Sequence, residues 1–197
     1  RQMCIRDSVY SALTREYGNK KEVVQHFYHK DTSVPIWAIF EVLTLGEFGN
    51  FYSCLSYGVR REVSIKLGFH QPSDSDAFLT KKIIFAIKEL RNAVAHNDVI
   101  FDTRFSRSSI DKSLSSSLEI VTGIKSITFK SITDYIILVV YLLKCFGVPK
   151  GDMRRFVAEF QDNIETLRKQ IPTSLFARIV LTDTRPKLKS LQEYIRK

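Results

Sequence analysis

Apolar residues recur along most of this chain at the spacing of one helical face, and the pattern predicts an all-α fold. The clearest case is residues 76–97, where a polar loop rich in helix N-cap residues precedes a long amphipathic segment. Its apolar stripe follows the i, i+4, i+7, i+11 rule and consists of Ile83, Ile87, Leu90 and Val94. We expect this stripe to face the core.

Shorter helical patterns flank this segment on both sides. Residues 9–30 form a helical stretch interrupted at Gly18 and Asn19. Pro35 suits the first turn of a helix that would bury Trp37, Phe40 and Leu43 or their neighbours. Further helices are expected at residues 36–44, 50–55, 59–67, 133–146, 151–171, 174–181 and 185–197.

Two segments lack a clear helical pattern. Residues 101–117 are rich in serine and show little apolar periodicity, so we predict a mobile basic loop. Its cations could guide an RNA backbone, or the loop could be a solvated connector without a role; they are Arg104, Arg107 and Lys112. Residues 120–132 are compatible with a short hairpin or an extended crossover.

The charge balance indicates a polyanionic partner. The chain of 197 residues has 44% hydrophobic and 26% charged residues, which is ordinary for a soluble globular protein. Its 30 Lys and Arg exceed its 21 Asp and Glu, for a net charge of +9. Such an excess favours RNA or DNA, although a basic surface that serves only solubility would have the same composition.

Cysteine usage and hydropathy favour a cytoplasmic protein that does not enter the membrane. Cys4, Cys54 and Cys145 include no Cys-x-x-Cys pair, so neither a zinc site nor a disulfide framework is expected. The most apolar run, residues 135–143, is far shorter than the roughly 20 residues of a membrane span. It is predicted to be a buried helix.

The candidate chemistry lies near the end of the segment 76–97. Histidine exchanges protons near neutral pH, and arginine holds phosphate oxygens with a planar fork, so Arg91 and His96 could act on a phosphodiester. Lys88, Asn92 and His96 are four residues apart and would line one wall. Arg91 lies about 140° from His96 around an ideal helix, so one chain offers an incomplete site. The alternative is a hydrogen-bonded helix end without chemistry.

These residues carry a resemblance to known families. Arg91, Asn92 and His96 resemble the Arg-polar-x-x-x-His signature of HEPN domains, which are helical bundles with many ribonucleases among them. Residues 35–48, with Pro-x-Trp-x-x-x-Glu-x-x-x-x-Gly, resemble the segment that precedes this signature in Abi-like phage-resistance proteins. Phe101 and Arg104 continue the similarity, which covers roughly residues 10–145.

The resemblance implies a HEPN-like bundle over residues 9–147, with residues 148–197 as an additional C-terminal helical region. It implies a metal-independent endoribonuclease without a cofactor, in which the 2′-hydroxyl of RNA attacks the adjacent phosphorus to give a 2′,3′-cyclic phosphate. His96 would move protons, Arg91 would neutralise charge on the phosphate, and Asn92 would hold the imidazole or donate to phosphate.

The resemblance also implies a bacterial defence protein that forms a homodimer, in which two copies of the signature build one composite site. Two alternatives stay open. The domain could be a catalytically inactive RNA-binding or dimerisation module, or it could be the toxin half of a pair controlled by an antitoxin or another regulator. Fragments with cyclic phosphate ends would distinguish an enzyme from a binder.

Glu41 is unusual because carboxylates are seldom buried without a partner, and it lies within an apolar stretch. It could pair with Arg91 or orient His96, or it could face water on the back of its helix.

Residues 1–8 are expected to be foreign to the natural protein. Their sequence, Arg-Gln-Met-Cys-Ile-Arg-Asp-Ser, is what a transposon-based sequencing adapter encodes in one reading frame. On this interpretation the natural chain continues upstream. The alternative is a disordered native tail.

Overall fold

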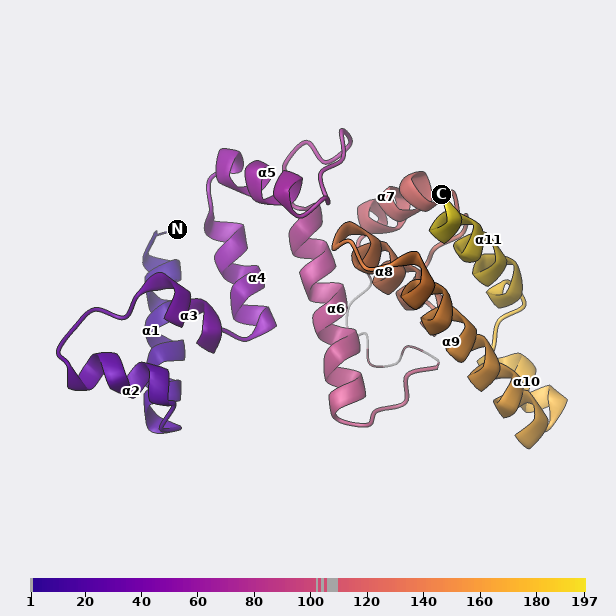
Figure 1. The fold of residues 1–197 in the computed structure, drawn as a ribbon, viewed down its shortest axis with the longest axis horizontal. Coiled ribbons are helices and arrows are strands. Elements are labelled where there is room, and N and C mark those ends of the chain that lie inside the picture. Colours follow the sequence, from indigo (N-terminus) through magenta and orange to yellow (C-terminus); the bar gives the residue numbers. More distant parts are fainter. Residues whose placement is uncertain (1, 102, 104, 106–109) are drawn as a thin grey trace.

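The computed structural model of the protein describes residues 2–101, 103, 105 and 110–197 (Figure 1). This part of the chain contains helices and no strand, which confirms the all-α prediction. The helices are α1 (Gln2–Gly18), α2 (Glu22–His29), α3 (Ile36–Val42), α4 (Leu45–Cys54), α5 (Tyr57–Lys66), α6 (Leu79–Ala95), α7 (Lys112–Thr122), α8 (Ile132–Cys145), α9 (Lys150–Gln170), α10 (Thr173–Ile179) and α11 (Thr184–Arg196).

The helices are arranged around two separate cores. Figure 1 shows α1–α3 at one end of an elongated molecule, α8–α11 at the other, and α4–α6 between them. The smaller core joins Leu13, Val24 and Val42 of α1–α3. The larger core extends from Phe69 to Ile195 and surrounds α8, which is buried along most of its length, as its apolar sequence predicts.

The two halves meet where α4 crosses α6. A Cβ atom built on Gly49 of α4 would lie only 2.7 Å from Cε2 of Phe85 on α6, so the helices approach closely because this residue has no side chain. Gly46 and Gly49 in the sequence are compatible with a turn or a tightly packed crossing, and the structure shows the crossing, since both residues lie within α4. This contact places the first turn of α4 beside the C-terminal half of α6.

A buried ion pair connects the C-terminal helices to the rest of the larger core. The Lys187 ammonium on α11 donates to Oδ1 of Asp134 on α8 at 2.7 Å and to Oδ2 of Asp183 at 2.8 Å. Oδ2 of Asp134 accepts the backbone N–H groups of Thr128 and Phe129, both at 2.9 Å. Burial lowers the pKa of Lys187, but its hydrogen bonds to the two carboxylates outweigh that effect and raise the pKa above its ordinary value.

The structure corrects the expected mobile loop at residues 101–117. Residues from Lys112 onwards form α7, which begins where the Asp111 side chain accepts the Ser113 N–H at 2.8 Å. Leu114 and Leu118 of α7 are buried in the larger core. Residues 120–122 belong to α7 and Ile132 begins α8. The segment between the two helices forms no strand, so the expected hairpin is wrong; it is a short irregular connection, in which Ser126 and Phe129 have positive φ.

In α3 the core is formed by the neighbours of the aromatic residues and not by the aromatic residues themselves, which is one of the two outcomes that the sequence predicted. Trp37 is 57% exposed and Phe40 is 40% exposed, whereas Ala38 and Val42 are buried. The helix is therefore rotated so that Val42 and Ala38 face α1 and the aromatic rings face outward, where Phe27 contacts Trp37 edge-on. The expected boundaries after residues 8 and 147 stay predictions.

Candidate active site at the end of α6

The end of α6 is fixed by the residue that follows His96. Asn97 has a φ of 55°, in the left-handed region that asparagine tolerates better than most residues. Its N–H donates to Val94 O at 3.3 Å, and the N–H of Asp98 donates to Ala93 O at 2.9 Å. These two bonds form a Schellman motif with His96 at the C-cap. The imidazole is therefore presented at the last position of a rigid helix, exposed to solvent.

The start of α6 is fixed by a carboxylate. Oδ1 of Asp74 accepts the backbone N–H groups of Phe78 and Leu79, both at 3.1 Å. Burial raises the pKa of Asp74, while these backbone donors act in the opposite direction. The helix therefore begins three residues later than the predicted residue 76, at Leu79, and Ala95 is its last residue before the cap.

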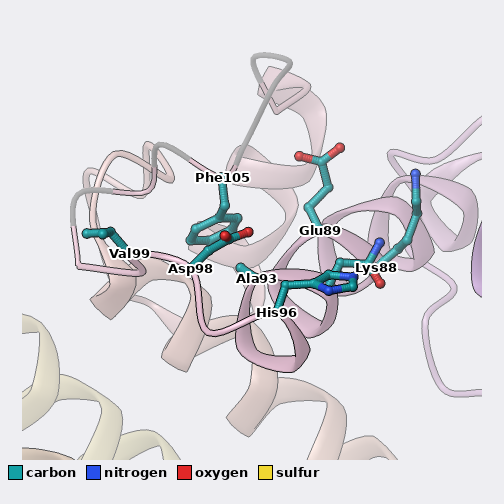
Figure 2. A pocket seen from close by; sticks show the side chains of 8 residues that line it. Lys88, Glu89, Ala93, His96, Asp98, Val99 and Phe105 are labelled. Atoms are coloured by element: carbon teal, nitrogen blue, oxygen red, sulfur yellow. The ribbon is translucent and has the colours of Figure 1, made fainter.

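A pocket of about 580 Å³ opens along this end of α6. The residues that line it come from the last turns of the helix and the segment after it; they are Lys88, Glu89, Asn92, Ala93, His96, Asp98, Val99 and Phe105. Figure 2 shows Lys88, Glu89 and His96 on α6, and Asp98, Val99 and Phe105 beyond its end. The predicted stripe of Lys88, Asn92 and His96 is thus one wall of a single pocket.

Arg91 lies beside this pocket and does not line it. Its side chain is exposed, and its Nη1 donates to Oδ1 of Asn92 at 3.0 Å. The carbonyl oxygen of the Asn92 amide accepts from the guanidinium, which leaves the donor atoms of this amide on its Nδ2 group. The Arg91 guanidinium and the Asn92 amide are therefore bonded to each other and together offer N–H donors beside the pocket.

Lys88 connects this wall to α4. Its Cε would lie 3.5 Å from a Cβ built on Gly46, so the aliphatic stem passes over this glycine. Its ammonium lies 5.5 Å from the centre of the Phe85 ring. Gly46 is the last residue of the Pro-x-Trp-x-x-x-Glu-x-x-x-x-Gly pattern in the segment 35–48, so the structure brings that segment into contact with the helix that carries the Arg-Asn-x-x-x-His run.

The structure does not bring the other expected residues to the pocket. Glu41 is exposed on α3, and in the described part of the chain no hydrogen bond or ion pair joins it to Arg91 or His96, so it faces water. Arg104 and Arg107 lie outside the described residues. Lys112 is the exposed first residue of α7 and does not line the pocket.

Sequence reasoning missed two carboxylates at the pocket. Glu89 lies one turn before Asn92, and Asp98 lies two residues after His96. The helical spacing of Glu89 from Asn92 could have identified it. Asp98 could not be placed by periodicity, because it lies beyond the end of the helix. Both bring negative charge to a wall that otherwise presents Lys88 and, beside it, Arg91.

Among the described residues, no group of three or more His, Cys, Asp and Glu side chains is arranged to hold a metal ion. No described helix combines the length and apolar character needed to cross a membrane.

Comparison with known proteins identifies one family. The family model described as Abi-like protein matches residues 2–102, about half of the chain, and the match contains α1–α6 together with Arg91, Asn92 and His96. The comparison with curated proteins found no match, and neither did the comparison with solved structures.

Proposed function

This chain belongs to the Abi-like protein family, and we propose that it is a metal-independent endoribonuclease of the HEPN type that acts in abortive infection. The observation that carries the proposal is the pocket at the end of α6, where Lys88, Asn92 and His96 share one wall and Arg91 is bonded to Asn92. The net charge of +9 supports RNA as the substrate.

In the proposed reaction the 2′-oxygen forms a bond to the adjacent phosphorus as the bond from phosphorus to the 5′-oxygen breaks. One proton leaves the 2′-hydroxyl and another reaches the 5′-oxygen, so the products are a 2′,3′-cyclic phosphate and a free 5′-hydroxyl. His96 exchanges these protons, and the exposed position at the helix cap leaves its ring accessible to RNA. Arg91 and the Nδ2 group of Asn92 donate to the non-bridging oxygens, where negative charge develops.

The proposed reaction needs a base and an acid at the same time, and among the described residues of one chain His96 is the one histidine that lines this pocket. We therefore include a homodimer in the proposal, with two copies of the α6 end facing each other around a two-fold axis. In that arrangement the two His96 rings divide the roles of base and acid. The setting we propose is the cytoplasm of an infected bacterial cell, with an antitoxin or another regulator as a third component.

The test is an RNA cleavage assay on purified protein. His96→Ala and Arg91→Ala should each lower the cleavage rate at least 100-fold, because each removes a group that acts in the transition state. His29→Ala is the matched control, since His29 is an exposed histidine at the end of α2, outside the pocket. Product ends distinguish the classes: a 2′,3′-cyclic phosphate supports the enzyme, whereas RNA that is bound at unchanged length supports an inactive binding module.

The dimer has its own test. Mixing unmodified protein with increasing amounts of His96→Ala gives heterodimers that contain one intact histidine. A composite site that needs both rings predicts inactive heterodimers, so the cleavage rate should fall with the square of the fraction of unmodified chains. A rate that falls in simple proportion to that fraction, in a sample that sedimentation identifies as dimeric and exchanging chains, would contradict the shared site.

A further inference from the structure

A second pocket, of about 600 Å³, lies at the end of the molecule formed by the C-terminal helices, between α9, α10 and α11. It is lined from all three helices and from the turn that joins α10 to α11. It belongs to residues that follow the part of the chain matched by the family model. Its volume is typical of pockets that bind small molecules.

The interior of this pocket is apolar. Ile164 and Leu188 form its inner side and are buried in the larger core. Phe176 and Val180 are partly buried against the same core, and Leu181 is 41% exposed. The pocket therefore leaves apolar surface of these side chains in contact with water, which is unfavourable and would be relieved by an apolar ligand.

The mouth of the pocket carries an excess of positive charge. Glu165 accepts from Arg185 Nη2 at 2.5 Å and lies 3.6 Å from Arg168 Nη1. The hydrogen bond from Arg185, together with the nearby charge of Arg168, holds the pKa of Glu165 below its usual range. Two guanidinium groups thus share one carboxylate, so one positive charge remains among these three residues. The nearby Asp183 carboxylate does not line the pocket; it contacts Lys187 at 2.8 Å and shares that cation with Asp134.

The guanidinium groups retain the capacity to bind an anion. Arg168 and Arg185 have side chains that are 49% and 67% exposed, and each guanidinium carries five N–H donors, of which Glu165 occupies a minority. The planar fork of arginine matches the two oxygens of a carboxylate.

We propose that this pocket binds a monocarboxylate with an unbranched apolar tail, of the fatty-acid class. The tail lies against Ile164, Phe176 and Val180, and the carboxylate bridges Arg168 and Arg185 at the mouth. The single excess positive charge matches a monoanion, and the apolar interior matches a hydrocarbon chain. This site is independent of the pocket at the end of α6.

The test uses decanoate as the probe, below its micelle concentration, with the full chain and isothermal titration calorimetry. We expect saturable binding of one decanoate per chain, with 1-decanol at least tenfold weaker and acetate without measurable affinity. The Arg168→Ala, Arg185→Ala double variant should bind decanoate at least tenfold more weakly. The matched control is the Arg154→Ala, Arg155→Ala variant, whose exposed arginines lie on α9 outside the pocket.

A gain of affinity provides a second measurement that loss of folding cannot imitate. Glu165→Gln removes the competing carboxylate, so decanoate should bind several-fold more tightly than to the unmodified protein. The proposal is overturned if decanoate binds without saturation, if the two double arginine variants weaken decanoate binding equally, or if Glu165→Gln weakens binding.

Discussion

Arg91 donates through Nη1 to Oδ1 of Asn92 at 3.0 Å, although the two residues are neighbours in sequence and their side chains leave α6 in different directions. The arginine side chain is long enough to reach the amide of the next residue around the helix. It couples a cation that does not line the pocket to an amide that does. Asn92 is therefore both a donor at the proposed site and the residue that holds Arg91 beside it.

Asn92→Ala should lower RNA cleavage about 10- to 100-fold, because a hydrogen bond to a charged group contributes about 1.5–3 kcal/mol. Asn92→Asp keeps an acceptor for Arg91 but replaces the Nδ2 donor with negative charge, so it should weaken RNA binding in addition. Rates and RNA affinities of both variants check this, with circular dichroism to establish that α6 is intact. Activity near that of the unmodified protein in both variants would exclude a role for Asn92.

The features of α6 could be predicted because they depend on local rules. Of the apolar stripe expected to face the core, Ile83 is buried and Ile87 and Leu90 pack against the larger core. The expectation is wrong for Val94, which is 61% exposed, because the last turn of α6 extends beyond the core. Asn97, directly after His96, is a frequent residue at a helix end. The alignment of Lys88, Asn92 and His96 follows from the helical period. The contact between Arg91 and Asn92 could not be predicted, since residues adjacent in sequence do not face each other on a helix.

Elements that depend on tertiary packing were harder to predict. The buried face of α7 contains only two leucines, Leu114 and Leu118, and the serines around them are typical of a loop. The two turns of α3 can place either of two apolar faces inward, and packing against α1 selects Ala38 and Val42 over Trp37. Sequence alone also gave Glu41 no preference between a partner and water.

Gly49→Ala should destabilise the protein by about 1–3 kcal/mol, the usual cost of overpacking a close contact. The new methyl group would lie 2.7 Å from Phe85 and would force α4 away from α6. Gly58→Ala is the matched control in α5, because nothing lies within 4 Å of a Cβ at that position, and alanine there should be neutral or stabilise the helix slightly. Urea denaturation of both variants measures the difference; equal midpoints would contradict the tight crossing.

Lys187→Met should cost about 3–5 kcal/mol, since it leaves the buried Asp134 carboxylate without its cation. Lys189→Met on the exposed face of the same helix should change the free energy of unfolding by less than about 0.5 kcal/mol. Asp134→Asn in the Lys187→Met background should recover part of the loss, because it removes the unpaired charge. A double variant less stable than Lys187→Met would contradict this account of the pair.

Glu47 provides a prediction for the pH dependence of stability. Its carboxylate on α4 accepts from Arg15 Nη1 of α1 at 2.5 Å and from the Thr44 N–H at 2.8 Å. The hydrogen bond from Arg15 lowers the pKa of Glu47 from 4.5 to about 2 in the folded protein. A carboxylate whose pKa is lower in the folded than in the unfolded protein contributes its full stabilisation at pH values above the unfolded pKa. For Glu47 this stabilisation is lost as the pH falls from about 4.5 towards 2.

Glu47→Gln should therefore be less stable than the unmodified protein at pH 7, by about 1–2 kcal/mol after discounting for solvent screening. The difference should shrink steadily below pH 4.5, because protonated glutamate and glutamine carry the same charge. Glu62→Gln is the matched control, since Glu62 pairs with Lys66 in an exposed position, where such pairs contribute little. Urea denaturation at pH 7, 4 and 3 measures the trend, and a Glu47→Gln penalty as large at pH 3 as at pH 7 would contradict the pairing with Arg15.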